Sequence, residues 1–209
     1  MKGRTTYSRL NEEEREGFYD ELGQKIINAI YEETVVTPFA VLACVFMART
    51  LALEEQPTQT IYQAFVAYMK TLGYAMAPSF ADENKAFTDT IAQYKERGFL
   101  TIEESEDEPN LFVVDNKDRI TLEYYKNNIL NCFVPAALIA NVILKYPHGI
   151  ARKPFYDEIQ RLARLMENEF IVDPKAAEKA LDHFKNAKMI AESQGMFYIE
   201  RAHKETLAD

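Results

Sequence analysis

Glycine and proline are scarce in this sequence, with 7 and 8 residues out of 209. Hydrophobic residues make up 47% and charged residues 27% of the chain. This composition excludes a disordered or low-complexity chain. The length and the apolar content are sufficient to bury a hydrophobic core, in one domain or in two small ones.

Positive charge is also in short supply. Lysine and arginine number 24 against 33 aspartates and glutamates, which gives a formal net charge of −9. An acidic surface repels both phosphate backbones and anionic lipid headgroups. We therefore expect neither nucleic acid nor the bulk membrane surface as a direct partner.

Long hydrophobic runs are missing. The longest apolar stretches, 38–48 and 133–144, fall short of the roughly 18 apolar residues that a membrane-spanning helix needs. No apolar segment follows the basic residues of the N-terminus, so we expect no signal peptide. Cys44 and Cys132 lie inside apolar runs without metal or redox spacing, which predicts buried thiols in a reducing, cytoplasmic compartment.

Hydrophobic periodicity predicts a mainly α-helical fold. Thr37 followed by Pro38 is a helix start signal, because threonine caps the first turn and proline suits the first helical position. Gly73 is expected to end a helix as its C-cap. The helices are predicted at about 10–33, 39–51, 58–72, 82–98, 121–131, 136–144, 153–170 and 174–188, with a linker at 74–80 and a cap at Asp173.

Two β-hairpins are predicted between these helices. The first joins 99–102 to 111–114 through an acidic tip, and the second joins 189–190 to 196–199 around Gln194-Gly195.

The order of helices and hairpin occurs twice. The segment around Pro38 aligns with that around Pro135, an offset of 97 residues (135 − 38), and Tyr94 aligns with Phe184, an offset of 90 (184 − 94). We therefore expect a duplicated helical unit, each copy ending in a short β-hairpin, with a winged-helix-like outline. The expected parts are a polar N-terminal segment (1–17), a first unit (18–117), a second unit (118–202) and a tail (203–209).

A winged-helix outline raises the question of DNA binding, in which the helix before the hairpin enters the major groove. The first hairpin argues against it, because its tip carries Glu103, Glu104, Glu106, Asp107 and Glu108, which would face phosphate. A stand-alone winged-helix-type regulatory or adaptor module remains an alternative function.

Signatures of catalysis and metal binding are absent from the sequence. The three histidines, His148, His183 and His203, have no metal-ligand spacing and no cysteine nearby. There is no glycine-rich phosphate loop, no G-x-S-x-G turn and no HExxH motif. The sequence therefore offers no catalytic residue, no metal site and no cofactor site.

A polar aromatic run directly precedes the second apolar helix and is a candidate contact surface. Tyrosine is enriched in such surfaces. The alternative is a helix whose polar face is simply in water. The run consists of Tyr124, Tyr125, Lys126, Asn127 and Asn128.

A basic set further along the chain is a weak candidate for an anion site. Arg161 and Arg164 share a helix face by their i, i+3 spacing. Neighbouring Asp157, Glu158 and Glu167 can pair with these cations instead. The full set is Arg152, Lys153, Arg161 and Arg164.

Two of these motifs resemble a known family. Val36-Thr37-Pro38 before an apolar helix, and 124–129 before Phe133-Val134-Pro135, resemble the C-terminal region of the membrane-associated glycerol-3-phosphate acyltransferases, relatives of the dihydroxyacetone-phosphate acyltransferases. The resemblance covers about 23–201. It implies that Thr37, Pro38 and the 124–128 run are candidates for contact with an acyltransferase domain.

The resemblance also implies what the chain does not do. Such enzymes transfer an acyl group from acyl-CoA or acyl-carrier protein to the 1-hydroxyl of glycerol 3-phosphate in phospholipid synthesis. A His-x4-Asp motif supplies the general base and the aspartate that orients it. The residues five positions after the three histidines are Lys153, Lys188 and Ala208, so this motif is absent.

We therefore expect a non-catalytic region that supports the acyltransferase domain of the same or a matching protein. Any place at the inner face of the membrane would come only through that parent protein. A third interpretation is a pocket for a lipid or acyl chain between apolar helices. The 7 methionines and 13 phenylalanines would allow it, although such residues more often form plain core.

Overall fold

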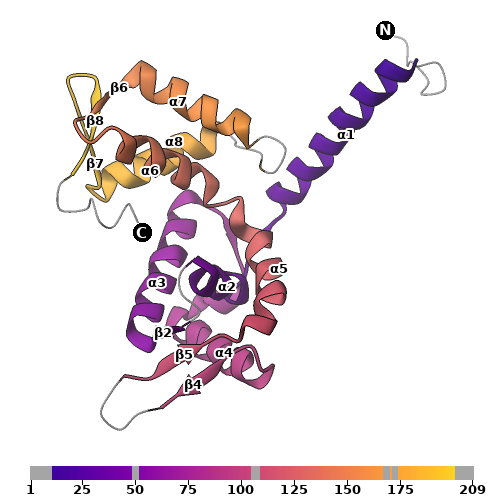
Figure 1. The fold of residues 1–209 in the computed structure, drawn as a ribbon, viewed down its shortest axis with the longest axis vertical. Helices are drawn as coiled ribbons and strands as arrows, with labels where there is room; N and C mark the ends of the chain where they lie inside the picture. Colours follow the sequence, from indigo (N-terminus) through magenta and orange to yellow (C-terminus); the bar gives the residue numbers. More distant parts are fainter. Residues whose placement is uncertain (1–10, 49–51, 105–108, 167–169, 171–173, 201–209) are drawn as a thin grey trace. The chain divides into compact units, whose positions relative to one another are not determined.

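A computed structural model of the chain describes residues 11–48, 52–104, 109–166, 170 and 174–200 (Figure 1). The chain divides into two compact units, 1–34 and 35–209. The described part of the first unit is essentially one helix, α1 (Glu12–Glu32), close to the prediction of 10–33. A capping box starts it, because the side chain of Asn11 accepts the N–H of Glu14 (2.8 Å) and the carboxylate of Glu14 accepts the N–H of Asn11 (2.9 Å).

The second unit is built around α2 (Pro38–Ala48). The hydroxyl of Thr37 accepts the N–H of Ala40 at 3.2 Å, which confirms the predicted helix start. Pro38 and the run 40–46 are buried, so α2 is a central helix, as its apolar sequence indicates. No single helix of the described residues is long and apolar enough to cross a membrane.

Three helices pack against α2: α3 (Glu55–Leu72), α4 (Glu83–Glu96) and α5 (Arg119–Leu130). Figure 1 shows them around α2, which is seen nearly end-on. The predicted C-cap of α3 is confirmed, because Gly73 has φ 79°, a left-handed conformation that suits glycine. The side chain of Asp82 caps α4 by accepting the N–H of Lys85 at 2.9 Å.

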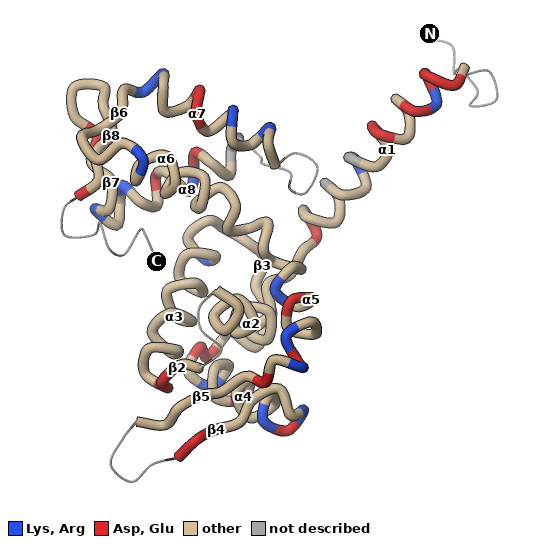
Figure 2. Tube along the Cα trace, viewed as in Figure 1, with Lys and Arg blue, Asp and Glu red and all other residues tan. Residues whose placement is uncertain are grey.

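The first hairpin belongs to a sheet of three strands. The predicted pair is confirmed, and a third strand at 52–54, which the sequence did not indicate, pairs with β5 from the other side. Glu103 and Glu104 are exposed, and β4 is partly red in Figure 2; the tip at 105–108 lies outside the described residues. The strands are β2 (Ala52–Glu54), β4 (Thr101–Glu103) and β5 (Leu111–Val113), in the antiparallel order β2-β5-β4.

The segment 74–80, expected as a linker, contains regular structure. A short strand, β3 (Ala75–Met76), pairs in parallel with β1 (Val35–Val36). A 3-10 turn, η2 (Pro78–Ala81), follows and buries Phe80. A second such turn, η3 (Asn116–Asp118), leads into α5.

The rest of the chain repeats the same kinds of elements. The second hairpin is confirmed, with Gln194 and Gly195 at φ 51° and 72°, as a two-residue turn of the I′ type requires. The helix predicted at 153–170 ends at Leu165, and the predicted cap Asp173 lies outside the described residues. The elements are α6 (Val134–Lys145), β6 (Ile150–Ala151), α7 (Arg152–Leu165), α8 (Pro174–Asn186), β7 (Ile190–Ser193) and β8 (Met196–Ile199), with strand order β6-β8-β7.

The described fold is thus mainly α-helical with small sheets, as predicted. In both three-stranded sheets the last strand in sequence lies between the other two. One hydrophobic cluster draws its buried residues from 36–132 and a second from 139–197. These observations favour the duplicated, winged-helix-like unit, which stays a prediction, as do the expected domain boundaries.

Tyr68 of α3 contacts residues from both halves of the unit 35–209. Its hydroxyl donates to the carbonyl of Cys132 at 3.2 Å, its ring stacks on Phe133 with centroids 5.7 Å apart, and the ring of His183 meets it edge-on at 5.2 Å. The ammonium of Lys179 on α8 lies 3.4 Å from the carbonyl oxygen of Leu72 at the end of α3. The contact between α3 and α8 therefore joins the two halves of the unit 35–209.

Candidate interaction surfaces

The 124–128 run lies on α5, and the helical period divides it. Tyr125 and Lys126 are half-buried, and the ring centroid of Tyr125 lies 4.5 Å from that of Phe39 on α2. Tyr124, Asn127 and Asn128 are exposed. The structure therefore places only part of the run where a partner could touch it.

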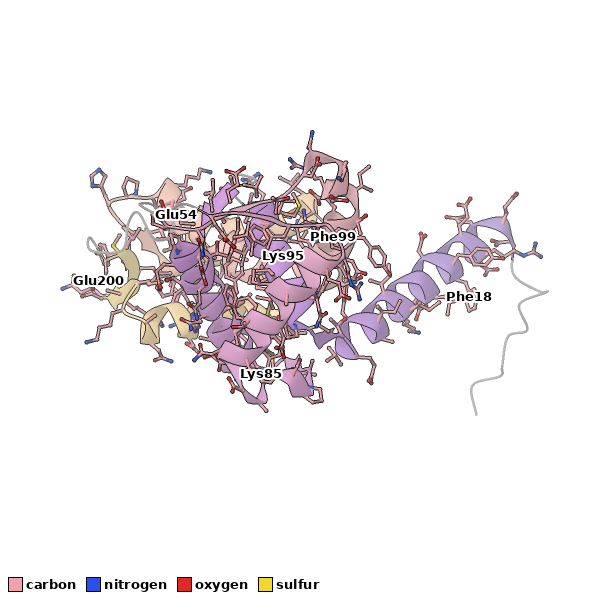
Figure 3. All side chains as sticks on the ribbon, turned by 90° about the horizontal axis from the view of Figure 1, so that it is seen from below. Phe18, Glu54, Lys85, Lys95, Phe99 and Glu200 are labelled. Carbon is pink, nitrogen blue, oxygen red and sulfur yellow. The ribbon has the colours of Figure 1, made fainter. Side chains whose placement is uncertain are left out.

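Phe39 is the centre of an aromatic cluster that holds α2, α4 and α5 together. Tyr94 is fully buried; its ring lies 4.3 Å from that of Phe39 and its hydroxyl donates to the Phe39 carbonyl at 2.9 Å. Phe99, which follows α4 and is labelled in Figure 3, meets both rings edge-on. The guanidinium of Arg97 lies 5.3 Å from the Phe39 ring centroid. Tyr125 completes this cluster, so its ring has a packing role.

The outward side of α5 is defined by a different set of residues. Ile120 and Tyr124 are 83% and 66% exposed and stand one helical turn apart, with Asn127 on the next turn. An exposed isoleucine beside an exposed tyrosine and asparagine has the composition of a contact surface. We call Ile120, Tyr124 and Asn127 the outer face of α5. Its use in binding stays a prediction.

Thr37 and Pro38 contribute to the fold. The hydroxyl of Thr37 is engaged in capping α2, and Pro38 is buried at the start of that helix. Thr37 is half-buried and Pro38 is buried, so their contact with a partner stays a prediction.

Half of the basic set is paired with carboxylates. Arg161 makes two hydrogen bonds to Glu158, at 2.8 and 3.0 Å, and Lys145 lies 2.5 Å from the same carboxylate. The hydrogen bonds from Arg161 and, to a smaller extent, from Lys145 lower the pKa of Glu158 to about 2. Arg152 is 3.4 Å from Glu192.

The other two cations of the set are Lys153 and Arg164, both exposed on α7. Neither makes an ion pair with another described residue, and Glu167 lies outside the described ranges. They are eleven residues apart on one helix, or about 16 Å along its axis, and Figure 2 shows blue positions spread along α7. The structure therefore does not bring the four predicted cations together around one anion.

The histidines occupy unrelated places. His148 is exposed in the turn between α6 and β6, and His203 lies outside the described residues. Burial of His183 lowers its pKa. Within the described ranges no group of three or more His, Cys, Asp or Glu residues is placed to hold a metal ion.

The two cysteines are buried, as predicted. Desolvation raises the pKa of Cys44 to about 12 and that of Cys132 to about 11. Thiols with such pKa values are protonated at neutral pH and are poor nucleophiles.

Sequence reasoning missed the junction at Tyr68. The ring of His183 meets a ring that lies 115 residues away in the sequence (183 − 68), and no local pattern indicates such a contact. The apolar row of α1, in contrast, is visible in the sequence as residues 18, 22, 26, 27 and 30, and the structure leaves these side chains 41–60% exposed.

Comparison with known proteins agrees with the sequence motifs. The family model of the glycerol-3-phosphate acyltransferase C-terminal region matches residues 2–208. The glycerol-3-phosphate acyltransferase of Pseudomonas fluorescens strain SBW25 is 24% identical over 141 residues, which cover 62% of this chain and 16% of that protein. That of strain Pf-5 is 21% identical over 121 residues, which cover 57% of this chain and 14% of that protein. The matches thus span less than a fifth of the length of these relatives.

Among solved structures, a chain of the Nse1-Nse3-Nse4 complex is similar over 79% of this chain and 69% of its own length, at 15% sequence identity. Its TM-score of 0.26 is too low to establish a shared fold. The identification rests on the family match, which spans nearly the whole sequence. The chain belongs to the family of glycerol-3-phosphate acyltransferase C-terminal regions.

Proposed function

We propose that this chain is a non-catalytic region that supports an acyltransferase domain in the acylation of glycerol 3-phosphate. The observation that carries the proposal is the family match over residues 2–208, which is to the C-terminal region of these enzymes. The missing His-x4-Asp motif supports the non-catalytic part, because that motif supplies the general base.

The surroundings of the described histidines support the same conclusion. A catalytic histidine of this type needs a carboxylate that fixes its tautomer and stabilises its protonated form. Neither His148 nor His183 is hydrogen-bonded to a carboxylate of the described residues, and His183 is packed edge-on against Tyr68. Burial lowers the pKa of His183 without a compensating negative charge.

The outer face of α5 is the surface of the unit 35–209 that we propose for contact with the acyltransferase domain. The rest of α5 is held against α2 through Tyr125 and Phe39, so this face is presented by a fixed helix. A rigid surface loses little conformational entropy when it binds. Tyr124 is a suitable probe because it is 66% exposed, whereas replacement of Tyr125 would also disturb the core.

Two measurements test this function. The isolated chain is assayed for acyl transfer from acyl-CoA to glycerol 3-phosphate, and no turnover above background is expected; turnover would contradict the non-catalytic assignment. The chain is then added to the separately expressed acyltransferase domain of the same organism's enzyme. We expect binding and a higher specific activity, with binding weakened by Tyr124→Ala. Absence of both effects would contradict the supporting role.

One observation favours a second candidate, a stand-alone adaptor of winged-helix type that binds protein. The two three-stranded sheets share one strand order, and in both halves a helix, a strand and two further helices precede the hairpin. The identity of the protein that the chain binds distinguishes the two functions, because an adaptor would bind a protein that lacks the His-x4-Asp motif. A DNA shift at low salt would indicate nucleic acid instead, against the exposed acidic Glu103 and Glu104.

A further inference from the structure

An apolar stripe runs along α1. Leu22, Ile26 and Ile30 recur every fourth residue, so they lie on one side of the helix. Their exposed fractions are 41%, 51% and 60%, and Ile27 beside them is 43% exposed. Large contiguous patches of exposed apolar side chains mark interaction sites on proteins.

The helix that carries the stripe is well started but weak by itself. The capping box at Asn11 and Glu14 and the ion pair between Lys25 and Glu21 (2.5 Å) favour the helix. Gly17 lies inside the helix and lowers its stability relative to alanine. In proteins, most of the stability of a helix comes from tertiary packing of its amphipathic face. A covered stripe would therefore stabilise α1.

The charge of α1 limits what can cover it. The helix contains seven acidic and two basic residues, a net charge of −5 (2 − 7), and red dominates its N-terminal half in Figure 2. An anionic lipid surface would repel it. A second copy of this chain, with its net charge of −9, would bring like charges together. The charge instead complements a partner surface rich in lysine and arginine.

We propose that the apolar stripe of α1 docks into an apolar groove with a basic rim on the acyltransferase domain. This inference rests on the proposed function and names a surface for it. A helix that places i, i+4 and i+8 side chains in a groove is a common mode of recognition. The net charge of −5 on α1 is the observation that favours a basic rim around this groove.

The test measures binding of the full chain to the separately expressed acyltransferase domain by calorimetry. Leu22→Asp and Ile26→Asp each place a carboxylate in the stripe, and we expect each to weaken binding at least about tenfold. The matched control is Leu165→Asp on α7, where an aliphatic side chain that is 70% exposed receives the same change. We expect the control to bind within about twofold of the wild type. We also expect added salt to weaken binding, because it screens the basic rim.

The outcomes separate this inference from the function on which it rests. Wild-type binding that Leu22→Asp leaves unchanged overturns the docking of α1 but not the supporting role. No wild-type binding overturns both. If Leu22→Asp lowers the melting temperature of the chain in the absence of the acyltransferase domain, residues of the same chain cover the stripe. A wild-type dimer that Leu22→Asp dissociates would show that a second copy does. Either result overturns the proposal, and binding that salt does not weaken overturns the basic rim.

Discussion

Tyr94 gives a quantitative test of the packing around α2. Its side chain is fully buried, its ring lies 4.3 Å from that of Phe39, and its hydroxyl donates to the Phe39 carbonyl at 2.9 Å. Tyr94→Phe removes only the hydrogen bond. Burial raises the pKa of the hydroxyl, so the bond is made by the neutral phenol. We expect a loss of about 1 kcal/mol in the free energy of unfolding.

Tyr94→Ala removes the ring as well. Deletion of a buried aromatic ring costs about 3–5 kcal/mol, because the transfer free energy is lost and a cavity remains. Urea denaturation followed by circular dichroism measures both variants, with Tyr124→Ala as the exposed control at about 0.5 kcal/mol or less. Equal losses for the phenylalanine and alanine variants, or a loss below about 1 kcal/mol for alanine, would refute the packing described for α2 and α4.

Three further predictions concern backbone, pH and thiol reactivity. Gly149→Ala should destabilise the chain more than Gly73→Ala in thermal unfolding, because both glycines have positive φ but only at Gly149 would a Cβ lie 2.5 Å from the ring of Tyr198. Burial lowers the pKa of His183 in the folded chain, so the unfolded chain binds the proton more readily. The contribution of His183 to the free energy of unfolding should be fully present above the pKa of the unfolded chain, about 6.5, and should be lost as the pH decreases through this value. Cys44, with its pKa raised to about 12, should react with iodoacetamide at pH 8 only after denaturant is added.

Helix starts and ends were the features of the fold most visible in the sequence. Thr37-Pro38, Gly73 and Asp82 act through residues within one turn, so local sequence suffices to place them. The strands at 52–54 and 150–151 were missed because they are two or three residues long. Their conformation depends on partners far along the chain, and no alternation can be read over so few positions.

The candidate surface was predictable only in part. In the sequence, 124–128 is one continuous polar run. Which of its residues face water depends on the helix against which α5 packs. Tyr125 points to Phe39 and Tyr124 does not, a difference fixed by contacts across 86 residues (125 − 39). Likewise, the ion pair of Arg161 with Glu158 follows from i, i+3 spacing, whereas the second partner, Lys145 on α6, does not.

The supporting role is tested most directly by the acyl-transfer rate of the acyltransferase domain, measured with and without this chain at saturating acyl-CoA and glycerol 3-phosphate. We expect no turnover by the chain alone and a higher rate when the two are combined. Turnover by the chain alone, or a rate that the chain leaves unchanged while the domain is fully active by itself, would contradict it.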